Sequence, residues 1–177
     1  MLKTFFQARF PENAFFHFFL SVCVLVLTGV LCVSDAFAKS VFVLRMEDDI
    51  LSVSDWPNSN KVDERIRFYG VRFPSANEPM GKEAKEFLLR FLRKGAKIDI
   101  QVVSVNTEDG VGEALIQVDG HSINYALVDQ GLAWVDRHEC NAPYCRRWHL
   151  VEHKAVQDRK GIWGLDLETP PWQWHYK

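Results

Sequence analysis

Two arginines, Arg67 and Arg72, lie close together within the segment Arg65–Phe87, which reads RIRFYGVRFPSANEPMGKEAKEF. Arginine presents a planar fork of N–H donors that matches a phosphate or a carboxylate group. Together the two side chains could therefore form a metal-free binding site for such an anion. The alternative is structural. In that case the guanidinium groups pair with Asp48 or Asp49, two acidic residues earlier in the chain, and hold this end of the fold shut.

A second set of reactive side chains lies toward the C-terminus, at Cys140, Cys145, His149 and His153. Their spacing is that of a zinc site, with both histidines one turn apart on a helix. His149–His153 also reads H-x-x-E-H, a metallopeptidase signature. In an exported protein, however, an even pair of cysteines at short spacing predicts a disulfide. We expect a Cys140–Cys145 disulfide that fixes the start of the last helix, with the histidines on its solvated face.

The N-terminal stretch differs from the rest of the chain. No charged residue occurs in Ala14–Ser34, Lys3 and Arg9 precede this apolar run, and Ala36-Phe37-Ala38 after it forms an A-x-A cleavage signal. We predict a secretory signal peptide over residues 1–38, export to the periplasm or medium, and no stable membrane association after cleavage. An uncleaved membrane anchor is the alternative, because about 20 apolar residues span a bilayer.

Residues 39–177 have the length of one domain. The 177-residue chain is 47% hydrophobic and 25% charged, an ordinary globular balance, and its formal net charge is −2. A slightly acidic protein lacks the global positive field that attracts nucleic acid, although a local basic groove is compatible with it. We expect a monomer.

Alternating apolar residues and turn signals predict strands at Ser40–Met46, Ile50–Ser54, Val62–Val71, Lys97–Val105 and Ala114–Val118, with a bulge or bend at Gly70. Helical spacing predicts helices over Lys82–Lys94, closed by Gly95, over Ile123–Gln130, and over Arg146–Lys160. Five strands and three helices in this order fit a mainly β, α+β fold: a five-stranded Greek-key barrel of the OB type. In the tail, Trp172 and Trp174 are expected to pack back on the barrel.

Several separated motifs resemble the staphylococcal nuclease (thermonuclease) family. Where that family has roughly R-L-x-G-I-D-A-P-E and Y-G-x-E-A, this chain has R-F-Y-G-V-R-F-P-S and M-G-K-E-A. The resemblance continues through I-N-Y-A-L-V-D-Q-G-L-A-W-V (Ile123–Val135) and K-G-I-W-G (Lys160–Gly164), and it covers nearly everything after residue 40. It implies the same OB-type barrel over residues 39–177. It also implies a site for phosphodiester hydrolysis with one calcium ion.

The resemblance assigns two site positions and leaves three unmatched. Asp49 falls on a family calcium carboxylate, and Arg67 falls on the first catalytic arginine. Arg72 stands where the family has its second metal-binding aspartate, Ser75 where it has the catalytic glutamate, and Val111 where it has the second arginine. General acid–base help contributes about 10²–10⁴-fold in rate, and a charge-stabilising arginine roughly 10³–10⁵-fold. The residues present are therefore expected to leave little hydrolysis.

We accordingly expect a catalytically inactive domain without a cofactor. It would act as a binding or structural module, with nucleic acid or another phosphate-bearing or anionic ligand at Arg67 and Arg72. The alternative is a weak calcium-dependent nuclease for DNA or RNA that uses Asp49 and Arg67. Arg72 is expected to pair with Asp49 or Asp48 and to leave no room for a coordinated ion.

Overall fold

The structure is a computed structural model, and it describes residues 38–165. All but the last residue of the predicted signal peptide lies outside the described residues, as do Trp172 and Trp174. Within the described range, no helix is long and apolar enough to cross a membrane.

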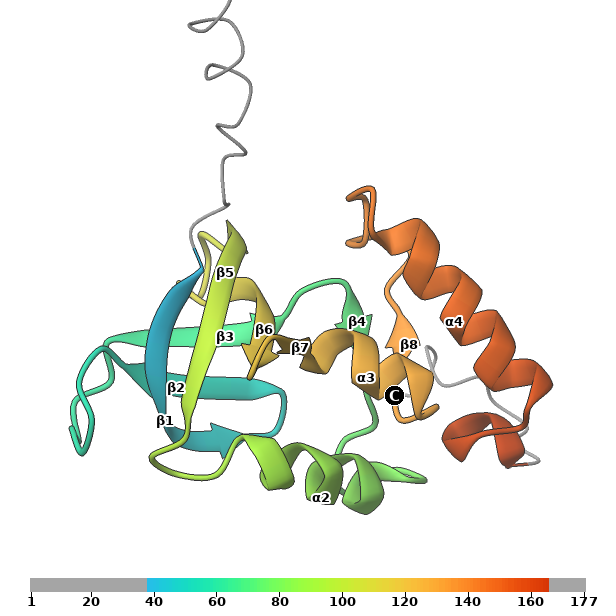
Figure 1. Ribbon diagram of the computed structural model, residues 1–177, viewed down its shortest axis with the longest axis horizontal. Helices are drawn as coiled ribbons and strands as arrows, with labels where there is room; N and C mark the ends of the chain where they lie inside the picture. Colours follow the sequence, from blue (N-terminus) through green and yellow to red (C-terminus); the bar gives the residue numbers. More distant parts are fainter. Residues whose placement is uncertain (1–37, 166–177) are drawn as a thin grey trace, which may run out of the picture. The chain divides into compact units, whose positions relative to one another are not determined.

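The elements follow one another in the predicted order (Figure 1). The strands are β1 (Lys39–Glu47), β2 (Ile50–Ser54), β3 (Glu64–Phe68), β4 (Val71–Arg72), β5 (Lys97–Val105), β6 (Gly112–Val118), β7 (His121–Ser122) and β8 (Trp134–Val135). The helices are α2 (Gly81–Phe91), α3 (Ile123–Asp129), α4 (Cys145–Gln157) and the 3₁₀ turn η1 (Gly161–Gly164).

Five of the strands form the barrel. β1 pairs antiparallel with β2 and β5, β2 pairs with β3, and β5 pairs with β6. The parallel pairing of β3 with β6 closes the ring, and the two-residue strand β7 extends β6 at its far edge. This arrangement confirms the predicted five-stranded, OB-type α+β fold.

The predicted third strand, Val62–Val71, is wrong in its extent. Its barrel part ends at Phe68, and the chain bends away through Gly70 before β4 pairs with β8 in a separate two-stranded ladder. Gly70 has φ +68°, and a Cβ there would lie 2.7 Å from Sγ of Cys140. Only glycine therefore fits this bend. The bend matters because it carries Arg72 off the barrel.

Two helix boundaries also differ from the prediction. α2 ends at Phe91, and α4 covers Cys145–Gln157. Leu92 is fully buried just beyond the end of α2, so the apolar spacing continued past the last helical residue. Gly95 has the predicted left-handed conformation, but its N–H donates to the carbonyl of Val43 in β1.

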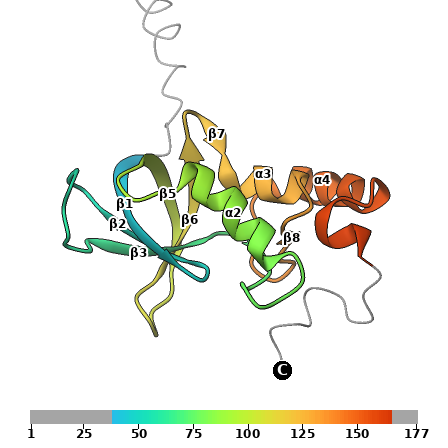
Figure 2. The ribbon, with the colours of Figure 1, turned by 90° about the horizontal axis from the view of Figure 1, so that it is seen from below.

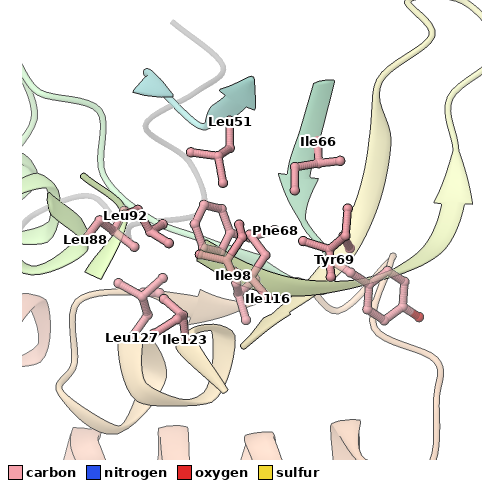
Figure 3. Packing of buried hydrophobic residues seen from close by; sticks show 14 of the residues in the cluster. Leu51, Ile66, Phe68, Tyr69, Leu88, Leu92, Ile98, Ile116, Ile123 and Leu127 are labelled. Atoms are coloured by element: carbon pink, nitrogen blue, oxygen red, sulfur yellow. The ribbon is translucent and has the colours of Figure 1, made fainter. Parts of the chain in front are cut away.

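The helices enclose the open sides of the barrel. α3 lies between the barrel and α4 in both views, and α2 runs beneath the strands in Figure 1 (Figures 1 and 2). Ser122 caps α3, because its hydroxyl accepts from the N–H of Tyr125. Figure 3 shows side chains from both helices meeting the strand residues in one core. The labelled members are Leu51, Ile66, Phe68, Tyr69, Leu88, Leu92, Ile98, Ile116, Ile123 and Leu127.

One buried amide ties α3 to the point where the chain leaves the barrel. The carboxamide of Asn124 accepts from the N–H of Ile116 at 2.9 Å and donates to the carbonyls of Tyr69 and Ala114. Asn124 has no exposed surface. Its hydrogen bonds therefore fix the Tyr69–Gly70 bend relative to β6.

Candidate functional site

Arg67, on β3, lies between two carboxylates. Its Nε is 3.1 Å from Oδ2 of Asp49, in the β1–β2 turn, and its Nη1 is 3.0 Å from Oδ2 of Asp109 in the β5–β6 loop. The predicted structural pairing with Asp49 is therefore present. Arg67 aligns with the first catalytic arginine of the family and Asp49 with a calcium carboxylate, so these two residues are in direct contact with each other.

Arg72 has other partners, and its predicted pairing with Asp48 or Asp49 is wrong. Its Nε is 3.2 Å from Oδ2 of Asp136, and its Nη2 is 3.6 Å from Oε1 of Glu113. The reason is the bend at Gly70. Since β4 pairs with β8 in place of a barrel strand, the Arg72 side chain meets the residue that follows β8 and a residue of β6.

Hydrogen bonds hold both the side chain and the backbone of Asp136. Its Oδ1 accepts from the N–H groups of His138 and Glu139, and its own N–H donates to the carbonyl of Gly70. Such an aspartate turn presents the second carboxylate oxygen in a fixed direction. That oxygen is the one next to Arg72.

Sequence reasoning missed both partners of Arg72. An aspartate directly after a short strand signals a turn, but nothing in its spacing links it to Arg72. Glu113 lies opposite Arg67 in the β3–β6 register, and its Oε2 accepts from the hydroxyl of Ser104 at 3.0 Å. Only the parallel closure of the barrel brings Glu113 to this end of the fold.

Val111 and Asp109 occupy the loop where the family has its second arginine. The Val111 side chain is fully buried, and its N–H donates to Oδ1 of Asp109 at 3.0 Å. This N–H, and then the guanidinium of Arg67, hold the pKa of the Asp109 carboxyl below its ordinary value. In place of the second arginine, this loop therefore has an apolar side chain that packs in the interior, Val111, and a carboxylate held in a fixed position, Asp109.

Ser75 lies on an exposed loop that is pinned to the start of α2. Its N–H donates to Oε2 of Glu78 at 2.7 Å. A Cβ on Gly81 would lie 1.8 Å from the Ser75 carbonyl oxygen, so the loop and helix approach as closely as glycine allows. The hydroxyl of Ser75 offers no carboxylate for proton transfer.

A cleft of about 730 Å³ opens beside Arg72. Arg72, Lys85 and Arg137 supply cationic groups to its lining, and Phe73 and Trp134 supply aromatic rings. The lining also contains four carboxylates, those of Asp48, Asp49, Asp136 and Glu152. Asp49 and Ser75 also line the cleft, whereas Arg67 is not among its lining residues. The cleft could therefore hold a ligand with an apolar body and an anionic group.

The residues at this site do not fit the calcium ion that the fold family implies. Calcium takes about six to eight oxygen ligands. Asp49 is occupied by Arg67, and a guanidinium held by Asp136 and Glu113 stands at the second carboxylate position. Among residues 38–165, no group of three or more His, Cys, Asp or Glu side chains is placed to hold a metal ion.

Cys140 and Cys145 form the predicted disulfide, with an S–S distance of 2.00 Å. The sulfur of Cys140 lies against Gly70, so the disulfide buttresses the bend that carries Arg72. Bonded cysteines cannot ligate zinc.

The H-x-x-E-H segment has a structural role in this fold. Glu152 is buried, and its carboxylate accepts from the N–H of Val135 at 2.8 Å and from Nη2 of Arg137 at 3.2 Å. Nδ1 of His149 is 3.7 Å from Oε2 of Glu152. Glu152 therefore anchors α4 to β8, and with it the segment that carries Asp136.

Residues 65–164 match the family described as staphylococcal nuclease homologue. The match covers more than half of the chain and includes the Gly70 bend, α4 and most of β3 and of the residues that line the cleft. This chain belongs to the staphylococcal nuclease homologue family.

Curated relatives carry nuclease names. The chain is 32% identical over 112 residues to a protein named "Probable staphylococcal-like nuclease" from Oryza sativa subsp. japonica, and 32% identical over 114 residues to the "Staphylococcal-like nuclease" of Arabidopsis thaliana. Each match covers 62% of this chain and 32% of the plant protein, so the chain spans about a third of the length of these relatives. An "Uncharacterized endonuclease" of Escherichia coli O157:H7 is 26% identical over 151 residues, which cover 84% of this chain and 90% of that protein.

Proposed function

We propose that this staphylococcal-nuclease-type domain has lost phosphodiester hydrolysis and acts as a binding module. The observation that carries the proposal is the pairing of Arg72 with Asp136 and Glu113. A positive charge held by two carboxylates at a family metal position opposes the binding of a cation there. The same pairing gives Arg72 a structural role that does not depend on catalysis.

The rest of the machinery supports the same conclusion. A general base needs a proton-accepting group within reach of the water molecule, and Ser75 supplies only a hydroxyl. The position of the second arginine holds the buried side chain of Val111. The charge that develops on a phosphoryl group would thus meet one guanidinium at most, that of Arg67, and two carboxylates already engage it.

Arg67 and Arg72 are the proposed ligand-binding groups. Arg72 lines the cleft with 27% of its side chain exposed, and Lys85 and Arg137 line the same cleft. We assign the anionic group of the ligand to this side, where it would compete with Asp136 for the guanidinium. Arg67 could join only a ligand that also competes with Asp49 and Asp109, since both carboxylates contact it.

We also propose that the domain is exported and works as a monomer. The apolar run before Ala36-Phe37-Ala38 supports export. The Cys140–Cys145 disulfide supports it as well, because such bonds persist in oxidising compartments.

A weak calcium-dependent nuclease is the second candidate. The nuclease names of several relatives favour it, as does the presence of Asp49 and Arg67, the two residues that match the family. The deciding experiment is digestion of single-stranded DNA and RNA by the purified protein, with calcium or with a chelator, beside an active calcium-dependent nuclease. We expect no cleavage in either condition. Cleavage that requires calcium and disappears in Arg67→Ala would overturn the proposal.

A further inference from the structure

A second cavity lies at the end of α2, away from the residues of the cleft. Its volume is about 380 Å³, and it shares no lining residue with the cleft. Arg90, Arg93, Lys94 and Lys97 line it, together with Phe91 and one acidic residue, Asp119. All four cationic side chains are exposed.

Within residues 38–165, no carboxylate pairs with these four cationic side chains, unlike those of Arg67 and Arg72. In the described part of the chain, Arg90, Arg93, Lys94 and Lys97 take part in no ion pair within 4.0 Å, whereas Arg67 and Arg72 each contact two carboxylates. The formal charge of the cavity lining is therefore strongly positive in a protein whose net charge is −2.

Helix stabilisation does not account for the whole group. A cation in the last turn of a helix interacts favourably with the helix dipole, but this effect falls off within that turn. Arg90 lies in the last turn of α2, which ends at Phe91. Arg93, Lys94 and Lys97 lie beyond the end of the helix, so the dipole does not explain them.

An exposed aromatic ring lies within the same group of charges. Phe91 is 37% exposed, and its ring packs against that of Phe87 in a tilted arrangement, with 5.4 Å between the ring centroids and 60° between the ring planes. Cationic side chains that follow a phosphate backbone, next to an aromatic face on which a base can stack, are the recurring elements of single-strand binding.

We propose that this cavity binds a single-stranded nucleic acid, with phosphates on Arg90, Arg93, Lys94 and Lys97 and a base stacked on Phe91. The site is independent of the cleft at Arg72, so the proposal goes beyond the function proposed above. Asp119 lies at its edge as a local repulsive charge.

The test is fluorescence anisotropy of a labelled oligothymidylate of about 12 nucleotides, within the roughly 4–16 nucleotides that such grooves cover. A chelator is present throughout, and the full-length protein is titrated at several salt concentrations. Four phosphate contacts predict a slope of log K against log salt of about −2.8, or roughly a 50-fold loss of affinity between 50 and 200 mM salt.

The variants separate this site from a general effect of charge. Arg93→Gln with Lys94→Gln should halve the slope to about −1.4. The control, Arg146→Gln with Lys154→Gln on the exposed face of α4, removes the same charge and should leave the slope unchanged. Phe91→Leu, which keeps an apolar contact with Phe87, should weaken binding at least about fivefold, because stacking on an aromatic ring is lost. Asp119→Asn should strengthen binding.

Equal losses in the Arg93/Lys94 variant and its control would overturn the proposal. So would a slope near zero, or binding to phosphatidylglycerol–phosphatidylcholine vesicles without binding to the oligonucleotide. A different result would contradict the function proposed for the cleft: cleavage of DNA or RNA in the presence of calcium that disappears in Arg67→Ala.

Discussion

Nε of Arg72 lies 3.2 Å from Oδ2 of Asp136, and that aspartate is itself fixed by four hydrogen bonds with backbone groups. The contact joins the two strands of the small β4–β8 ladder at the rim of the cleft. Glu113 holds the guanidinium from the barrel side at 3.6 Å. Arg72 is thus part of the support of the cleft as well as part of its lining.

Arg72→Asp should create a calcium response that we do not expect of the natural protein. The change removes the repelling guanidinium and adds a carboxylate near Asp49, Asp136 and Glu113. A ligand that binds only the folded state stabilises it by RT ln(1 + [L]/Kd), or about 1.4 kcal/mol at ten times Kd. The Tm of the variant should therefore rise by a few degrees in millimolar calcium. Ser75→Glu, which retains Arg72, should show no rise, and a calcium-dependent Tm in the unmodified protein would contradict this account.

The Arg72–Asp136 pair should contribute more to stability than an exposed pair of similar geometry. Because its side chains are 27% and 16% exposed, a double-mutant cycle with Arg72→Met and Asp136→Asn should give a coupling of about 1 kcal/mol. The Arg45–Glu47 pair, at 2.9 Å with 57% and 69% exposure, should give about 0.3 kcal/mol or less. Urea unfolding measures both cycles. Equal couplings would show that partial burial adds nothing here.

Removal of the disulfide should destabilise the domain moderately. Because the loop between Cys140 and Cys145 is short, the disulfide removes little conformational entropy from the unfolded chain, and its stabilisation of the fold is limited to about 2 kcal/mol. The double variant Cys140→Ala/Cys145→Ala should lose about that much free energy of unfolding. Dithiothreitol should destabilise the natural protein by the same amount and should have no effect on the double variant. Free thiols with stoichiometric zinc in protein purified without a chelator would refute the disulfide.

Asn124→Ala should be among the most damaging substitutions in the domain. It would leave the N–H of Ile116 and the carbonyl of Tyr69 without their amide partner, whereas the carbonyl of Ala114 would keep the N–H of Tyr69. Each unsatisfied buried group costs about 1–3 kcal/mol, so a loss of about 3 kcal/mol or more is expected in urea unfolding. Asn141→Ala, at an exposed asparagine, is the matched control and should cost far less.

The carboxyl of Asp109 should make stability depend on pH at the acidic end. The N–H of Val111 and then the guanidinium of Arg67 lower its folded-state pKa below the ordinary 3.8. The stabilisation is therefore complete above the unfolded-state pKa and is lost as pH falls through the lower folded-state pKa. Asp109→Asn should lower stability near about pH 6 and make no difference at strongly acidic pH. A titration midpoint of Asp109 above 3.8 by NMR would contradict this expectation.

The barrel could be predicted from the sequence because its signals are local. Strands such as Gly112–Val118 alternate buried and half-buried positions, and α3 has both its Ser122 cap and its closing Gly131. The extent of the third strand could not be predicted in the same way. Apolar residues continue through Val71, and what ends the strand is the packing of Cys140 against Gly70.

The site was predictable in part. Arg67 lies on β3, and Asp49 lies in the turn that leads into the neighbouring strand β2, so their pairing follows from the fold. The partners of Arg72 come from β6 and from the turn after β8, which only tertiary packing brings together. The signal that could have indicated them is chemical: an arginine at the position of a metal carboxylate needs counter-charges, and Asp136 and Glu113 supply them.

The parallel closure of β3 on β6 has a consequence for how the chain folds. β1–β2 and β5–β6 are hairpins whose strands are neighbours in sequence, whereas β3 and β6 are separated by β4, α2 and β5. Contacts between distant segments form slowly because the intervening loop must first be closed. The hairpins can therefore form early, while the ring closes late. The carboxylates of Asp109 and Glu113 reach their arginines only at that last step, so these two ion pairs form as a result of completed folding and cannot guide it.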